Sequence, residues 1–148
     1  MQFPYKAIFL RSPAIALGGR WQRPRPIVCA TLIGPTDSRL QEGLLDTGAD
    51  DTIFPHSLAA LIGVDLRNAP LGQSSTANRG LVTVRYARVI LRLTDGVERR
   101  EWPAWVGFSP TIHRPLFGFA GFLQFFTATF HGDREQVELS VNALYQGT

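Results

Sequence analysis

The stretch Leu44-Leu45-Asp46-Thr47-Gly48-Ala49-Asp50-Asp51-Thr52 decides the fold of this chain. Two apolar residues lead directly into an acid, and a glycine follows two positions later. An apolar strand that ends on Asp-Thr-Gly carries a carboxylate into the interior and then turns the chain back sharply. Burial of an ionised carboxylate is costly unless the group is paired or hydrogen-bonded, and perturbed acids of this kind cluster at functional sites. We therefore expect Asp46 to take part in chemistry.

The tripeptide Asp46-Thr47-Gly48 also has a plainer interpretation, a surface turn after a strand, because aspartate and glycine are both turn residues. The longer string is more specific. It adds the apolar pair before the acid, the small Ala49, the second acid Asp50 and a return to apolar character at Ile53-Phe54. The whole string therefore favours a functional loop over an ordinary turn.

Residues 44–52 resemble the active-site loop of the retropepsin-like aspartic proteases, the group that includes the retroviral proteases. A second resemblance lies at Leu116-Phe117-Gly118, where such domains place two apolar residues and a glycine before a short helix. The resemblance implies a mostly β, retropepsin-like acid-protease fold. It would be a closed, barrel-like half with one short C-terminal helix near residues 119–126.

The chain is expected to form one domain, because 148 residues are enough for a substantial core. The resemblance covers roughly residues 27–141, which form the predicted protease domain. Residues 1–26 lie outside it and are expected to form an N-terminal strand and an extended arm, with 12–25 as a loop rich in glycine and proline. Residues 142–148 are assigned to a C-terminal tail.

Local patterns predict many short strands between turns. Apolar and β-branched residues predict a strand at 27–33, and residues 39–45 return as its partner and deliver Asp46. Residues 81–93 predict a long strand whose alternation changes parity near Ala87 and Arg88, which indicates a bulge or a bend. The other predicted elements are strands at 5–10, 127–130 and 137–141, a hairpin turn at 94–97 and a short helix within 54–63.

The resemblance also implies a role for each residue of the loop. Asp46, Thr47 and Gly48 would be catalytic: Asp46 as the acid/base, Thr47 as a brace between two loops, and Gly48 as the tight turn. A hairpin whose tip is residues 76–80 would be the flap that closes over substrate. The implied substrate-binding residues are Ala49, Asp50, Asp51, Ile53, Thr76, Ala77, Asn78, Gly80 and Leu81.

Hydrolysis of a peptide bond needs a base that deprotonates water and an acid that protonates the substrate. One carboxyl group cannot be both, but two carboxyls about 3 Å apart can, because their repulsion keeps one protonated. The chain holds a single Asp-Thr-Gly, so the second aspartate must come from another chain related by a two-fold axis. The expected catalytic unit is a homodimer that needs neither a metal nor an organic cofactor.

One departure from the retroviral pattern concerns the residues after Gly118. A basic residue and then a polar one usually follow this glycine, whereas the chain has Phe119 and Ala120. The basic residue normally braces the second acid of the first loop. Asp50 therefore lacks its expected partner, and Arg114 is the alternative candidate for that role.

Composition narrows the setting of the protein. The net charge is +3, and the 14 arginines are scattered, which is typical of a solvated surface and predicts no nucleic-acid partner. A single cysteine, Cys29, excludes a disulfide framework within one chain and is expected to be buried in the core. We expect no signal peptide, no membrane-spanning segment and a cytoplasmic location.

The sequence thus predicts an aspartic endopeptidase that acts as a homodimer on a peptide or protein substrate. Two alternatives remain open. The same fold can serve as a catalytically silent dimeric binding or assembly module, because fold does not determine function. The chain can also be an unrelated β protein in which Asp46-Thr47-Gly48 is a plain turn.

Overall fold

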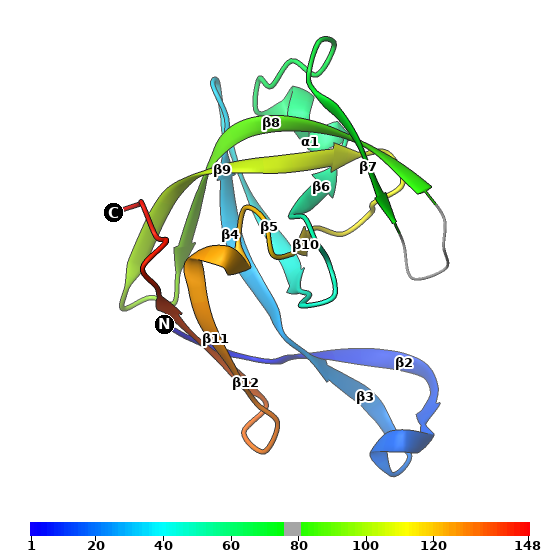
Figure 1. The fold of residues 1–148 in the computed structure, drawn as a ribbon. Helices are drawn as coiled ribbons and strands as arrows, with labels where there is room; N and C mark the ends of the chain where they lie inside the picture. The colour runs from blue at the N-terminus through cyan, green and yellow to red at the C-terminus, as the bar shows by residue number, and fades with distance from the viewer. Residues whose placement is uncertain (76–80) are drawn as a thin grey trace.

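The computed structural model describes residues 1–75 and 81–148 and is mostly β, as the sequence predicts (Figure 1). The helical elements are one α-helix, α1 (Ser57–Leu61), and two 3-10 turns, η1 (Ile15–Leu17) and η2 (Leu123–Phe125). The strands, in chain order, are β1 (Gln2–Pro4), β2 (Lys6–Ala14), β3 (Arg20–Arg25), β4 (Ile27–Ile33), β5 (Ser38–Leu45), β6 (Ile53–Pro55), β7 (Leu71–Ser75), β8 (Leu81–Thr94), β9 (Arg99–Ser109), β10 (Leu116–Phe117), β11 (Phe126–His131) and β12 (Gln136–Val141).

The largest sheet has seven strands in the order β4-β5-β10-β6-β9-β8-β7. Strand β4 also pairs with β8, so six of these strands form a closed ring and β7 extends from it. The sheet is mixed, because β5–β10 and β6–β9 pair in parallel while the other pairs are antiparallel. This arrangement places the end of β5, and with it Asp46, next to β10.

The core fills the ring and extends under the strands β11 and β12. Trp102 lies at its centre, 1% exposed, and donates a hydrogen bond from Nε1 to the Gly121 carbonyl over 3.0 Å. Trp105, three residues further along β9, is 57% exposed.

Cys29 is exposed, so the prediction that it is buried in the core is wrong. It lies between the buried residues Val28 and Ala30, and alternate residues of a strand face opposite sides.

The parity change in β8 has a different origin from the predicted bulge. The β8–β9 ladder keeps one register from Arg85 opposite Phe108 to Thr94 opposite Arg99, so it contains no bulge near Ala87. Instead, the strand contributes to two clusters, one on each face. On one face, Val82 and Val84 pack with Ile53. On the other face, the strand contributes Val89, Leu91 and Leu93 to the main core.

The predicted helix at 119–126 is wrong, since only the 3-10 turn η2 forms there. Gly121 interrupts an α-helix here, because it has a left-handed φ of 88°. The amides of Phe119 and Ala120, just before it, donate to carbonyls of the loop after β5. The helix predicted within 54–63 does form but is limited to α1, because Phe54 and Pro55 belong to β6.

The N-terminal residues contain more structure than the predicted strand and loop. Strands β2 and β3 form a two-stranded sheet of their own, which Figure 1 shows as a ribbon that projects from the rest of the molecule. Strand β1 pairs with β12 in a three-stranded sheet with β11. Within residues 1–75 and 81–148, no helix has the length and apolar character needed to cross a membrane.

Candidate active site

The loop that follows β5 holds the acid that the sequence singles out. Asp46 is half buried, and its Oδ1 accepts a hydrogen bond from the Gly48 amide over 2.9 Å. The Ala49 amide donates to the Asp46 carbonyl over 3.2 Å, which closes the turn. Thr47 and Gly48 are exposed. The carboxylate therefore belongs to a tight turn at the protein surface. It is less deeply buried than the sequence pattern predicts.

This loop is bound to the second stretch that the sequence singles out. Strand β10 pairs in parallel with the end of β5, with Leu116 opposite Leu44 and Phe117 opposite Leu45. The Asp46 amide then donates to the Phe117 carbonyl over 3.1 Å. The two stretches lie about 70 residues apart in sequence and form one unit in space.

Backbone hydrogen bonds continue this contact beyond β10. The Phe119 amide donates to the Ala49 carbonyl over 2.9 Å, and the Ala120 amide donates to the Asp50 carbonyl over 2.8 Å. The Thr52 amide donates in return to the Ala120 carbonyl over 2.9 Å. The loop is thus braced by main-chain groups at the positions where the retroviral pattern has a basic and a polar side chain.

Gly118 is required by the close approach of these two segments. A Cβ atom on this residue would lie 2.3 Å from the Asp51 carbonyl oxygen and 2.7 Å from that of Ala49. Thr52 is fully buried beside it, and its hydroxyl lies 3.5 Å from the Gly118 carbonyl. The contact leaves no room for any side chain at position 118.

A cavity of about 340 Å³ opens at the loop. It brings together six residues that the sequence predicts for catalysis or substrate binding: Asp46, Gly48, Ala49, Asp50, Asp51 and Ile53. The sequence did not single out the other lining residues as site residues; they are Ser74, Val82, Ile112 and Leu116. Val82 could have been found from its place on the same face of β8 as Val84, whereas Ile112 lies in a loop without a pattern.

The antiparallel strands β7 and β8 occupy the position predicted for the flap, which an ordinary β-hairpin would occupy equally. Ser74 of β7 lies opposite Val82 of β8 in the antiparallel ladder, and both line the cavity. The residues predicted for the tip, Thr76, Ala77, Asn78 and Gly80, lie outside the described residues. For Leu81, the structure places the backbone at the start of β8.

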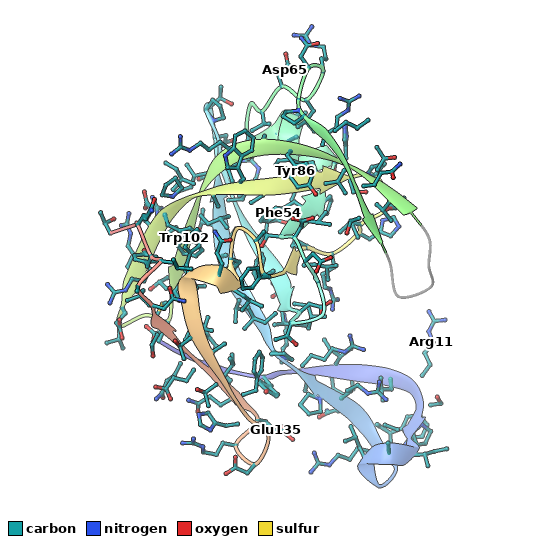
Figure 2. All side chains as sticks on the ribbon, viewed as in Figure 1. Arg11, Phe54, Asp65, Tyr86, Trp102 and Glu135 are labelled. Carbon is teal, nitrogen blue, oxygen red and sulfur yellow. The ribbon has the colours of Figure 1, made fainter. Side chains whose placement is uncertain are left out.

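Tyr86 is a site residue that the sequence analysis missed. Its hydroxyl donates a hydrogen bond to Asp51 Oδ2 over 2.7 Å, and Figure 2 labels it on β8. Burial, and then the hydrogen bond and charge of Asp51, raise the pKa of Tyr86 to about 12. Its ring packs against Gly72, where a Cβ atom would lie 2.7 Å from the ring. Asp51 is therefore fixed from the side of the hairpin as well as through its backbone.

Asp50 differs from its neighbour Asp51 in its surroundings. Its side chain is exposed, and the ion pairs between described side chains do not include one with Arg114. The three acids of this loop, Asp46, Asp50 and Asp51, thus have different surroundings.

In the part of the chain that the structure describes, no group of three or more His, Cys, Asp or Glu residues is arranged to hold a metal ion.

Comparison with known proteins adds no identification. No family model matches the chain, and no curated protein matches it significantly.

Proposed function

We propose that this protein is a retropepsin-like aspartic endopeptidase that works as a homodimer, with water activated between two Asp46 carboxylates. One observation supports this above all others. The half-buried Asp46 lines a cavity, and its loop is fastened to the segment around Gly118 by a set of backbone hydrogen bonds. A plain surface turn needs no such bracing, whereas a catalytic carboxylate must be held in a fixed position.

The chemistry follows from two carboxyls that share one proton. The ionised Asp46 takes a proton from water, and the water oxygen attacks the carbonyl carbon of the scissile peptide bond. The protonated Asp46 of the second chain donates its proton to the carbonyl oxygen. When the tetrahedral intermediate collapses, the first Asp46 gives the proton it took from water to the leaving nitrogen, and the carbon–nitrogen bond breaks. The Asp46 of the second chain takes back a hydroxyl proton as the carbonyl reforms, so the pair again holds one proton. The amide of Gly48, which donates to Asp46 Oδ1, fixes the orientation of the carboxylate.

The cavity walls indicate the kind of substrate. An extended peptide would lie between the loop after β5 and the β7–β8 hairpin, where main-chain groups can pair with it as an added strand. Ile53, Val82 and Ile112 form an apolar wall for one substrate side chain. Asp51, held by Tyr86, presents its carboxylate at the same cavity. We expect a preference for a large apolar side chain at this subsite.

The test is an assay of the purified full chain on an unstructured protein at mildly acidic pH. We expect cleavage by the wild type and a loss of about 10²–10⁴-fold or more in the Asp46→Asn variant, because asparagine cannot take the proton from water. Asp133→Asn, on an exposed turn, is the control. A dimer that binds unfolded protein without cutting it would support the silent binding module instead.

A further inference from the structure

The β2–β3 hairpin, residues 6–25, is called the arm here, and it lacks the support that a hairpin normally needs. It forms a sheet of two strands only, whereas an isolated two-stranded hairpin is at best marginally stable in water. Two ion pairs between exposed side chains, Lys6–Glu42 and Arg20–Glu135, join it to the body. Exposed ion pairs contribute little to stability, so among the described residues these two ion pairs do little to hold the arm in place.

The arm also exposes large apolar side chains on both of its faces. Phe9 is 77% exposed, Ile15 is 93% exposed and Trp21 is 58% exposed. Phe9 lies opposite Gln22, so the adjacent Trp21 points to the other face of the ribbon. Clustered exposed apolar residues of this kind mark an interaction surface.

The charge of the arm identifies what can cover it. The arm holds five bases, Lys6, Arg11, Arg20, Arg23 and Arg25, and no acid. All 12 acids of the chain lie outside it, so the rest of the chain is acidic although the whole carries +3. Among the described residues, the ion pairs include Lys6 and Arg20 but not the other three bases. Figure 2 shows Arg11 standing clear of the body.

The root of the arm lies at the candidate active site. The carbonyl of Pro26, the residue after β3, accepts a hydrogen bond from the Leu45 amide over 2.9 Å, one residue before Asp46. A molecule that docks on the end of the arm nearest Pro26 therefore lies near the loop that carries Asp46, Asp50 and Asp51. The proposed mechanism needs a second Asp46 at this same place.

We propose that the arm docks on a second copy of this chain, the copy that supplies the second Asp46, so that each subunit clasps the other. This inference rests on the proposed homodimer. Phe9, Ile15 and Trp21 pack against the body of the partner, and the arginines face its acidic loop. Because a two-fold interface is symmetric, each contact occurs twice. The acidic body of a second copy complements the arm in charge, and it offers an ordered surface to both faces of the ribbon.

The first test measures the dimer dissociation constant by sedimentation equilibrium at low and high salt. We expect Phe9→Ser with Trp21→Ser to raise it at least tenfold. Arg23→Glu with Arg25→Glu should raise it at low salt and remove its salt dependence. The matched controls are Val97→Ser, at a site that is 93% exposed outside the arm, and Arg134→Glu on the β11–β12 turn. Circular dichroism of each variant checks that the body remains folded.

The second test identifies the occupant directly. A photo-crosslinking residue replaces Ile15 in a mixture of chains labelled with nitrogen-14 and nitrogen-15, and mass spectrometry assigns each crosslink. Crosslinks that join one label to the other support the proposal, and crosslinks within one chain overturn it.

A dimer dissociation constant that is unchanged in the arm variants also overturns the role of the arm. If those variants keep their peptidase activity, the proposal of a homodimeric peptidase is not affected. Arm-dependent binding to anionic vesicles or RNA, with an unchanged dimer constant, would assign the arm to those partners instead. A wild-type chain that stays monomeric and inactive at every concentration would overturn both proposals.

Discussion

Tyr86 of β8 donates a hydrogen bond from its hydroxyl to Oδ2 of Asp51 over 2.7 Å, although the two residues lie 35 positions apart in the chain. This bond joins strand β8 to the loop after β5, in which Asp51 lines the cavity. Asp51 is also fixed through its backbone, because its carbonyl lies against Gly118. One acid of the loop is therefore held from two directions.

Replacement of Tyr86 by phenylalanine removes this bond and keeps the ring. We expect a loss of about 1 kcal/mol in the free energy of unfolding, since both partners are half buried and water replaces part of the bond. We also expect a higher KM for peptides, with a smaller change in kcat, because Asp51 would contact substrate rather than the reacting atoms. Urea unfolding and steady-state kinetics measure the two effects. Tyr5→Phe is the control, and an equal loss in that variant would contradict the role of the Tyr86 bond.

Stability at alkaline pH should depend on Tyr86. Its pKa is raised in the folded protein to about 12 from 10.0, so the bond stabilises the fold fully below pH 10. This contribution is lost as the pH rises from 10 towards 12, because the unfolded chain then releases its proton first. We expect the stability difference between the wild type and Tyr86→Phe to shrink between pH 9 and about pH 11. A difference that stays constant over this range, in urea unfolding at each pH, would contradict the prediction.

Gly118→Ala tests the contact between the two stretches. The added Cβ would meet two backbone carbonyls, which cannot move without displacing the loop. We expect a loss of about 3 kcal/mol in the free energy of unfolding, at the upper end for an overfilled site, and the loss of peptidase activity. Gly132→Ala is the matched control, because a Cβ there has nothing within 4 Å. Equal stability of the two variants would show that the segments do not approach so closely in solution.

A shared pair of carboxyls predicts how activity depends on pH and concentration. Activity requires one proton on the pair, so the pH profile should be bell-shaped and centred on the acid side of neutral. Activity per chain should fall on dilution through the dimer dissociation constant. An equal amount of Asp46→Asn chains, after exchange, should reduce activity per wild-type chain to about half, because half of those chains then have an inactive partner. Activity that neither dilution nor mutant chains change would rule out a site shared between subunits.

The sequence predicts the strands around the site well, and the resemblance places residues 116–118 beside the loop, but the backbone bonds that brace the loop are not predicted. The apolar run of β4 and the return in β5 are found in place, and Asp46 follows β5 as expected. The bracing of the loop depends on the amides of Phe119 and Ala120, and every residue except proline has such an amide. No pattern of side chains could therefore reveal it. The left-handed Gly121 interrupts the helix that the resemblance implies at 119–126.

The arm shows a second limit of sequence reasoning. Glycines and prolines indicate a loop at 12–25, yet the chain pairs Ile8 with Arg23 and Phe9 with Gln22. Strand formation depends on what lies opposite each residue more than on its own preference. Cys29 illustrates a related point, since its apolar neighbours predict burial and the alternation of the strand decides which side it faces.

The two ends of the long strand β8 are held to different degrees. Its far end is clamped, because residues 90–93 pair with β4 on one side and with β9 on the other. At its near end, the ladders of the described residues pair positions 81–84 with β7 alone. The wall that Val82 and Ser74 give the cavity can therefore bend while the ring stays closed. A single strand thus joins an end that is paired on both sides to an edge that is paired on one side only, so the cavity wall can move without any break in the ring.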